Sequence, residues 1–274
     1  MEEVYRGLWV VAYRDLLRFV QERSRIASSL AMPVLFLVVF GAGFNKVIGA
    51  LTPGVDFVKF MYPGIVAMNV IMNSLFSGMS IVWDREFGFL REILVAPIGR
   101  SGVVLGKAIS GAVVALVQGF IMLVLAPFLG VSLTPVLVLK LIPLLAVLSL
   151  CLSGIGILIA ARMRSQQGFQ ILMQVIIFPL MFTSGVFFPV NSVPLWLEVL
   201  AKINPVTYGV DAIRQLFLGD FLAKAAAVMP AGGNLVLGVT VFGHTMTIIE
   251  DVLIVGVLGL VLMVAAVWSF SRQD

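Results

Sequence analysis

The chain has 274 residues, of which 61% are hydrophobic and 12% are charged. A soluble domain carries about 25% charged residues, so this composition and a mean hydropathy of +1.11 predict an all-α integral membrane protein. The net charge of +4 is scattered among apolar runs and forms no dense basic patch, so no nucleic-acid partner is expected. The single cysteine, Cys151, excludes a disulfide framework, and no metal site is expected.

The first 25 residues predict an amphipathic helix that lies in the plane of the lipid headgroups. From Val4 to Val20, a period of 3.6 residues separates an apolar face from a basic one. A helix packed on other parts of the protein is the alternative. The apolar face carries Tyr5, Leu8, Trp9, Ala12, Tyr13, Leu16, Phe19 and Val20, and the opposite face carries Arg14, Arg18 and Gln21.

Six apolar runs follow, each long enough for the roughly 20 residues that cross a bilayer core. The third run has small residues at every fourth position, which predicts close helix packing within one subunit or, alternatively, at a subunit interface. These small residues are Gly102, Gly106 and Ser110, and Gly111, Ala115 and Gly119. The predicted spans are Ile26 to Ile48, Met61 to Trp83, Val103 to Leu125, Val136 to Ala161, Phe169 to Phe188 and Ile249 to Phe270.

The stretch WDREFGFLREILVAPIGR, residues 83–100, interrupts the apolar runs with charged residues. Charges this dense are costly in hydrocarbon, so the stretch is expected to stand in water as a helix of about three turns. Such a helix is suited to binding a soluble partner, and a solvated connector is the alternative. The predicted contact residues are Asp84, Arg85, Glu86, Phe87, Phe89, Leu90, Arg91 and Glu92.

Polar side chains within two of the spans predict either a path for cargo or hydrogen bonds between helices. Asn69, Asn73 and Ser77 share one face of the second span, and Gln170 and Gln174 share one face of the fifth. Amides in hydrocarbon need partners and tend to face a bundle interior or a wet cavity.

Residues 189–248 connect the fifth and sixth spans and are expected to be external. Pro194 and Pro205 divide the first part into apolar pieces of about 10 to 15 residues, which are too short to cross and are suited to re-entrant or interfacial helices. Residues 223–247 are rich in Gly and Ala and are expected to form an exposed cap.

The distribution of basic residues predicts the orientation of the chain. Twelve of the 18 Lys and Arg residues fall in segments on the side of the N-terminus. By the positive-inside rule, both termini and the charged stretch are therefore cytoplasmic.

The sequence contains no phosphate-binding loop. The nearest candidate, Gly102 to Ala108, is one residue short and has Ala108 where a hydroxyl is required. The chain is therefore expected to have no catalytic residues and no cofactor of its own. No span shows the filter-like loop of a channel, and no cluster of nucleophiles or paired carboxylates suggests an enzyme.

Two stretches resemble a known family: WDREFGFLREILVAPIGRSGVVLGK (83–107) and GVFFPVNSVPLWLEVLAKINPVTYGVDAIRQLFLG (185–219). Together with the order of elements, they resemble the permease subunits of ABC-2-type exporters over nearly the whole chain. The drug-resistance branch, exemplified by daunorubicin permeases, is the most similar, followed by the nodulation lipo-oligosaccharide permeases. Residues 223–247 are longer than the family pattern.

This resemblance implies one transmembrane domain over residues 1–274 of a multi-pass protein in the plasma (inner) membrane of a prokaryote. Residues 1–25 would be its connecting helix, residues 84–100 its coupling-helix loop and residues 189–248 its external region. Two permease chains, expected to be identical, would pair in the lipid, and two cytosolic ATP-binding cassette subunits would bind ATP and magnesium. The external gate would include Pro205, Tyr208, Asp211 and Arg214.

The expected function is export of a hydrophobic or amphiphilic compound, drug-like or lipid, driven by the separate ATPase. Export of a lipid-linked polysaccharide or glycolipid is the alternative within this class. A channel or a membrane-embedded enzyme is the alternative from another class.

Overall fold

The computed structural model of the chain describes residues 2–22, 24, 28, 30–39, 41, 43, 57–89, 99–131, 133–187, 190–226, 238–241 and 243–272, and most of them are helical. The elements are α1 (Glu2–Gln21), α3 (Phe57–Leu75), η1 (Phe76–Gly78), α4 (Met79–Glu86), α6 (Arg100–Leu125), η2 (Ala126–Leu129), α7 (Pro135–Ala160), α8 (Gln166–Thr183), η3 (Val190–Ser192), α9 (Leu195–Ile203), α10 (Pro205–Ala226), β1 (Thr240–Val241), β2 (His244–Thr245) and α11 (Ile248–Ser271).

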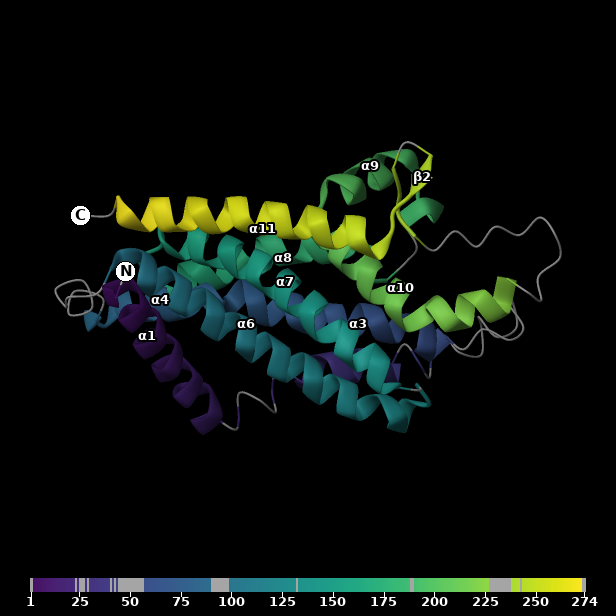
Figure 1. The fold of residues 1–274 in the computed structure, drawn as a ribbon, viewed down its shortest axis with the longest axis horizontal. Helices are drawn as coiled ribbons and strands as arrows, with labels where there is room; N and C mark the ends of the chain where they lie inside the picture. The colour runs from purple at the N-terminus through teal and green to yellow at the C-terminus, as the bar shows by residue number, and fades with distance from the viewer. Residues whose placement is uncertain are drawn as a thin grey trace.

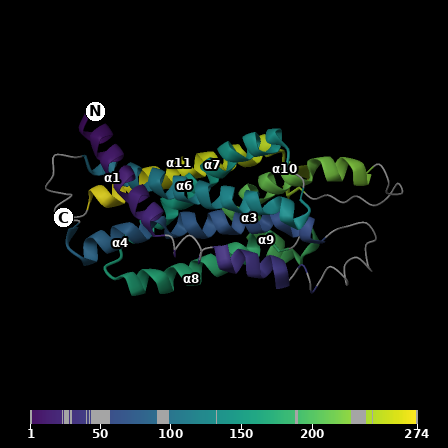
Figure 2. The same cartoon turned by 90° about the horizontal axis from the view of Figure 1, so that it is seen from below.

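The long helices form one elongated bundle (Figure 1). Within it, α6 and α7 pack on each other and on α3, α11 packs along α7, and α1 packs along α6. The first turn of α1 and the last turn of α11 lie at the same end of the bundle, whereas α9 and most of α10 lie toward the other end (Figures 1 and 2). The hairpin of β1 and β2 precedes α11, and Thr240 in β1 donates through its hydroxyl to Asn191 in η3.

Four helices among the described residues are long and apolar enough to cross a membrane, and they coincide with the predicted second, third, fourth and sixth spans. The predicted first span is only partly described and contains a shorter apolar helix, Leu30–Val39. Because α8 occupies the predicted fifth span without meeting the same criteria, the six-span topology stays a prediction. The four helices are Met61–Glu86, Arg100–Leu129, Pro135–Ala160 and Ile248–Ser271.

Glycines of α6 bring this helix close to its neighbours. A Cβ atom at Gly106 would lie 2.8 Å from the carbonyl oxygen of Leu8 in α1, and one at Gly111 would overlap the side chain of Ser77 in η1. Real Cβ atoms do not approach other atoms so closely. The small residues at these positions therefore serve packing within the chain, as expected.

Side-chain caps fix the beginnings of three helices. The hydroxyls of Thr134 and Ser165 each accept a backbone N–H from the first turn of α7 and α8. Thr247 and Glu250 form a capping box at the start of α11, in which each side chain accepts from the backbone N–H of the other residue. These polar residues therefore end the loops that precede the apolar runs.

The apolar face predicted for α1 is divided between two environments. Ala12 and Phe19 are buried, whereas Tyr5, Trp9 and Tyr13 are 71%, 63% and 55% exposed. The helix therefore packs on the protein along one side and presents an aromatic stripe on the other. Its location in the headgroup plane stays a prediction.

The external region differs from its prediction in two respects. The helix that begins at Pro205 was expected to span about 10 to 15 residues, but α10 has 22 residues and ends at Ala226. The expected exposed cap is also partly wrong, because Val239 is only 2% exposed. The re-entrant position of α9 and α10 stays a prediction, and residues 227–237 lie outside the described part of the chain.

Candidate functional site

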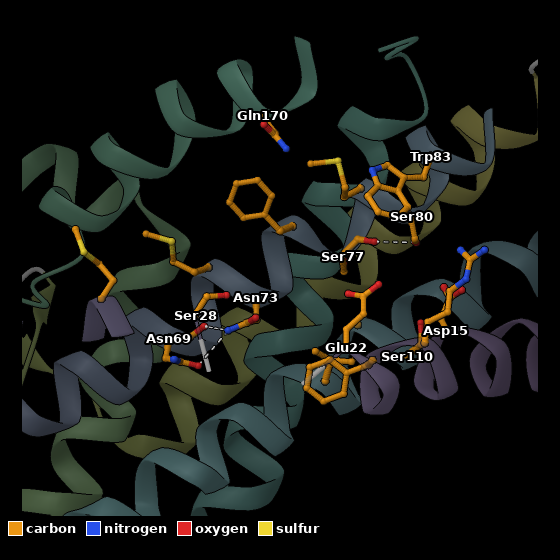
Figure 3. A pocket seen from close by; sticks show the side chains of 18 of the residues that line it. Asp15, Glu22, Ser28, Asn69, Asn73, Ser77, Ser80, Trp83, Ser110 and Gln170 are labelled. Carbon is orange, nitrogen blue, oxygen red and sulfur yellow. Dashed lines mark hydrogen bonds between the residues drawn. The ribbon is translucent and has the colours of Figure 1, made fainter. Parts of the chain in front are cut away.

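A cavity of about 630 Å³ lies among α1, the segment Leu30–Val39, α3, α4, α6 and α8 (Figure 3). All the polar residues predicted from the second and fifth spans line it, which places these two amide faces around one space. Their role as a path for cargo stays a prediction. These residues are Asn69, Asn73, Ser77, Gln170 and Gln174.

Helical periodicity explains the polar stripe on the wall. Asn69, Asn73 and Ser77 are spaced by four residues, so they project from successive turns of α3 and η1. The side-chain amide of Asn73 donates to the backbone oxygen of Asn69 at 2.9 Å and to its Oδ1 at 3.1 Å. Gln170 and Gln174 lie one turn apart on α8 and are exposed in the single chain. These amides can therefore donate to and accept from a bound molecule.

The remainder of the wall is mainly apolar. Methionine side chains are flexible and polarizable, so they adapt to bound groups of different shape. Aromatic rings add large flat apolar surfaces. A wall that combines these with a few amides is suited to an amphiphilic molecule. The apolar residues include Met32, Met68, Met72, Met79, Phe19, Phe76 and Trp83.

Charged residues from α1 and its C-terminal end also line the cavity, namely Asp15, Arg18 and Glu22, which directly follows the helix; Figure 3 labels Asp15 and Glu22. They are spaced by three and four residues and so share one face of the helix. Asp15 also takes part in a cluster of ion pairs beside the cavity.

Four charged side chains from α1, α4 and α6 form this cluster, called here the charge ring: Arg14, Asp15, Asp84 and Lys107. The Nζ of Lys107 lies 2.7 Å from Asp84 Oδ2 and 3.2 Å from Asp15 Oδ2. The Nη2 of Arg14 lies 2.7 Å from Asp84 Oδ2 and 3.3 Å from Asp15 Oδ1. The ring has two positive and two negative charges, so each buried charge has opposite charges beside it. Outside the ring, Arg18 adds a longer ion pair, with its Nη1 at 3.9 Å from Asp84 Oδ1.

The charge ring overturns one expectation. Asp84 was predicted to stand in water, but its side chain and that of Lys107 are each only 1% exposed. Two cations that are distant in the sequence lie against its carboxylate, which lowers the cost of burying it. Removing one partner would weaken this compensation, whereas a buried charge that loses its sole partner costs about 3 to 5 kcal/mol in other proteins.

The next two residues connect α4 to the loop between α7 and α8. The guanidinium of Arg85 donates to the carbonyl oxygens of Ala161 at 2.9 Å and Met163 at 2.5 Å. These groups follow the C-terminal end of α7, where carbonyls lack partners within the helix. The carboxylate of Glu86 accepts the backbone N–H of Gln166 at 3.0 Å, at the start of α8. Both side chains therefore have contacts within the chain.

The beginning of the three-turn helix predicted over the charged stretch is also wrong, because the first residues of the stretch belong to α4. α4 follows α3 through η1 and ends at Glu86, and Gly88 has a φ of +82°, which breaks the helix. Phe87 and Phe89 are 65% and 48% exposed. The predicted contact residues Leu90, Arg91 and Glu92 lie outside the described part of the chain.

The electrostatics of Arg14 follow from its neighbours. Burial lowers the pKa of its guanidinium, but the hydrogen bonds and negative charges of Asp84 and Asp15 outweigh this effect and raise the pKa above its ordinary value. Arg14 therefore remains a cation, as the charge balance of the ring requires.

The four predicted gate residues lie on α10, and three of them bind other elements. The Tyr208 hydroxyl donates to the carbonyl oxygen of Lys202 at 2.7 Å. The Asp211 carboxylate accepts from the backbone N–H of Val239 at 2.9 Å. Arg214 donates to the carbonyl oxygen of Gly185 at 2.6 Å. Pro205 begins the helix. These contacts hold together the end of the bundle opposite to the charge ring, and the gate role stays a prediction.

Sequence analysis did not identify Arg14, Asp15 and Lys107 as functional residues. Lys107 gave a usable signal, because it is the fifth residue of a predicted apolar span, where a cation needs a counter-charge. Arg14 and Asp15 gave none, since charged residues are ordinary on the polar side of an amphipathic helix.

Comparisons with known proteins agree on one family. The sequence profile of the family described as "ABC-2 type transporter" matches residues 6–218. The chain is 29% identical over 215 residues to the "Putative transport permease ycf38" of Cyanophora paradoxa, which covers 77% of this chain and 73% of that protein. It is 31% identical over 169 residues to the "Probable multidrug ABC transporter permease YbhR" of Escherichia coli K12, and the match covers 61% of this chain and 46% of that protein. It is 26% identical over 203 residues to "Nodulation protein J" of Rhizobium leguminosarum bv. viciae, and the match covers 73% of this chain and 78% of that protein.

Proposed function

The chain belongs to the ABC-2 type transporter family as a transport permease subunit, and on this premise we propose that it exports a hydrophobic or amphiphilic compound. The energy comes from a separate ATP-binding cassette subunit, which holds the ATP and magnesium. The observation that carries this proposal is the cavity of about 630 Å³, whose wall combines methionines and aromatic rings with a few amides.

The ATPase docks on the segment that follows α4. Phe87 and Phe89 follow α4 in the sequence and are exposed, so they are available to a groove on a cytosolic protein. Exposed aromatic side chains are frequent anchors of such interfaces. Two ATPase subunits and two identical permease chains form the complete transporter in the plasma membrane of a prokaryote, with both termini in the cytoplasm. The fact that α1 begins and α11 ends at one end of the bundle supports a common side for the two termini (Figure 1).

Lipid-linked polysaccharide or glycolipid is the second candidate cargo. Two sets of amides, Asn69 with Asn73 and Gln170 with Gln174, border the same cavity and could bind sugar hydroxyls. The similarity to "Nodulation protein J" is compatible with this cargo. In both cases the cargo leaves past α10, where Pro205, Tyr208, Asp211 and Arg214 form the external gate.

The proposal is tested by reconstituting the chain in lipid vesicles with the ATPase encoded beside it. ATP hydrolysis is titrated with a planar cationic dye and, in parallel, with a lipid-linked saccharide. Stimulation by the dye supports drug-like cargo, and stimulation by the saccharide supports the second candidate. An ATPase variant that lacks its phosphate-binding lysine serves as the control and should show no response. Failure of the ATPase to associate, or cargo movement without ATP, would contradict the exporter.

A further inference from the structure

We infer that Asp15, Lys107 and Asp84 form a relay that transmits occupancy of the cavity to the ATPase-docking segment. This inference rests on the proposed function, because it assigns a coupling role to residues beside the proposed cargo site. The three residues lie on three separate elements, α1, α6 and α4, and Lys107 forms ion pairs with both carboxylates.

The relay begins in the cavity. Asp15 lines the cavity wall and is 11% exposed, so one side of its carboxylate can meet a bound molecule (Figure 3). The same carboxylate pairs with Lys107 through Oδ2 and with Arg14 through Oδ1. A bound amine or hydroxyl that donates a hydrogen bond to Asp15 therefore competes with Lys107 for the carboxylate.

Lys107 transmits this change because it is buried. Its side chain is 1% exposed, so water does not replace a lost counter-charge. In a surrounding of low polarity, a cation must keep its carboxylates within contact distance. When the contact at 3.2 Å with Asp15 weakens, Lys107 depends more strongly on Asp84 at 2.7 Å.

Asp84 passes the change to the docking segment. It lies in the last turn of α4, directly before Arg85 and Glu86, which connect this turn to the ends of α7 and α8. Two residues after Glu86, the chain turns at Gly88 and presents Phe89 to solvent. A shift of Asp84 against α6 therefore moves the turn from which the docking segment departs.

Thermodynamic linkage makes the relay reciprocal. If cargo changes the affinity of the permease for its ATPase by a certain factor, the ATPase changes the affinity for cargo by the same factor. A change at a relay residue should therefore alter the factor by which cargo and ATPase affect each other's affinity. A change at a residue with only a packing role should alter stability and leave this factor unchanged.

The experiment is a double-mutant cycle on Asp15→Asn and Lys107→Met in the reconstituted complex. ATP hydrolysis is measured with and without the planar cationic dye, and also with and without the lipid-linked saccharide. For the probe that stimulates the wild type, the ratio of stimulated to basal hydrolysis should fall by about fivefold or more in each single variant. In the double variant this ratio should fall no further than in either single variant, since both substitutions break the same contact between Asp15 and Lys107.

Two further variants separate coupling from folding. Asp15→Glu keeps the negative charge at this position and should restore part of the stimulation that Asp15→Asn loses. This comparison tests the relay even if Lys107→Met impairs folding. Glu198→Gln removes an ion pair with Lys202 on α9, far from the relay, and should leave the ratio unchanged. If the wild type is stimulated and Asp15→Asn responds equally, the relay is wrong while the transporter stands. If neither probe stimulates the wild type, the proposed function fails and the relay fails with it.

Discussion

Gly78 and Gly156 are in contact where the helix of the second predicted span crosses α7. A Cβ atom at Gly78 would overlap the carbonyl oxygen of Gly156, and one at Gly156 would overlap the carbonyl oxygen of Leu75. Neither atom can be displaced by rotating a side chain, because both belong to the main chain. The two helices therefore meet backbone to backbone at this crossing.

Gly156→Ala should destabilise the folded chain by about 2 kcal/mol or more, because overpacking against backbone forces the helices apart. The measurement is the midpoint of thermal unfolding in detergent. Gly219→Ala is the matched control: a Cβ atom there meets open space, so this change should be neutral or stabilise α10 by up to about 1 kcal/mol. Equal midpoints for the two variants would contradict this account of the crossing.

Phe89→Ala should weaken binding of the ATPase by about tenfold, because an exposed aromatic anchor contributes about 1 to 3 kcal/mol when buried in an interface. Affinity is measured by titrating the purified ATPase onto the permease in lipid nanodiscs. Phe128→Ala is the control, since Phe128 is 84% exposed but follows α6 at its other end. A larger effect of the control would place the docking surface elsewhere.

The part of the fold that buries Asp211 should be more stable at low pH. Burial raises the pKa of the Asp211 carboxyl above its ordinary value of 3.8, although the hydrogen bonds from Val239 and Gln215 lower it in part. A carboxyl with a raised pKa contributes stability that is complete below 3.8 and is lost as the pH rises through the folded pKa.

Hydrogen–deuterium exchange of residues 208–215, around Asp211 in α10, tests this expectation. After correction for the intrinsic effect of pH on exchange, protection should be higher at about pH 4 than at about pH 8. Asp211→Asn keeps a side-chain oxygen for the Val239 N–H and should abolish the difference. A pH dependence that persists in this variant would assign it to another group, such as the nearby Asp251.

Asn73→Asp should shift cargo preference toward cations, because a carboxylate in the cavity wall attracts positive charge in a surrounding of low polarity. The measurement is the ratio of transport rates for a cationic dye and a neutral analogue of the same shape, and this ratio should rise about tenfold for about 1.4 kcal/mol of added attraction. Glu198→Gln, outside the cavity, should leave the ratio unchanged. An unchanged ratio in a folded and active Asn73→Asp variant would leave only hydrogen bonding between helices as the role of Asn73.

Local patterns were sufficient to predict several features of this fold. Apolar runs of about 20 residues located the four helices that are long enough to cross a membrane. The spacing of four residues placed Asn69, Asn73 and Ser77 on one face, and the structure puts them on one cavity wall. Each of these inferences depends on residues within one helix, where periodicity fixes direction.

Features that depend on distant partners could not be predicted. Asp84 was expected in water because its neighbours in sequence are charged, but its partners Arg14 and Lys107 lie 70 and 23 positions away. The length of α10 was underestimated because a proline marks where a helix can begin and says nothing about where it ends. Burial of a charge is decided by what the fold brings to it, which one sequence does not reveal.

Asp84 contacts α1 and α6, whereas the next two residues, Arg85 and Glu86, contact the segment that leads from α7 into the start of α8, because successive side chains on a helix are about 100° apart. One residue inserted or deleted between Gly78 and Asp84 would rotate all three by that angle and separate them from their partners together. A substitution at Trp83, which is 39% exposed, changes only one side chain. In this turn the chain should therefore accept changes of residue type more readily than any change of length, and insertions or deletions should be absent here in functional variants.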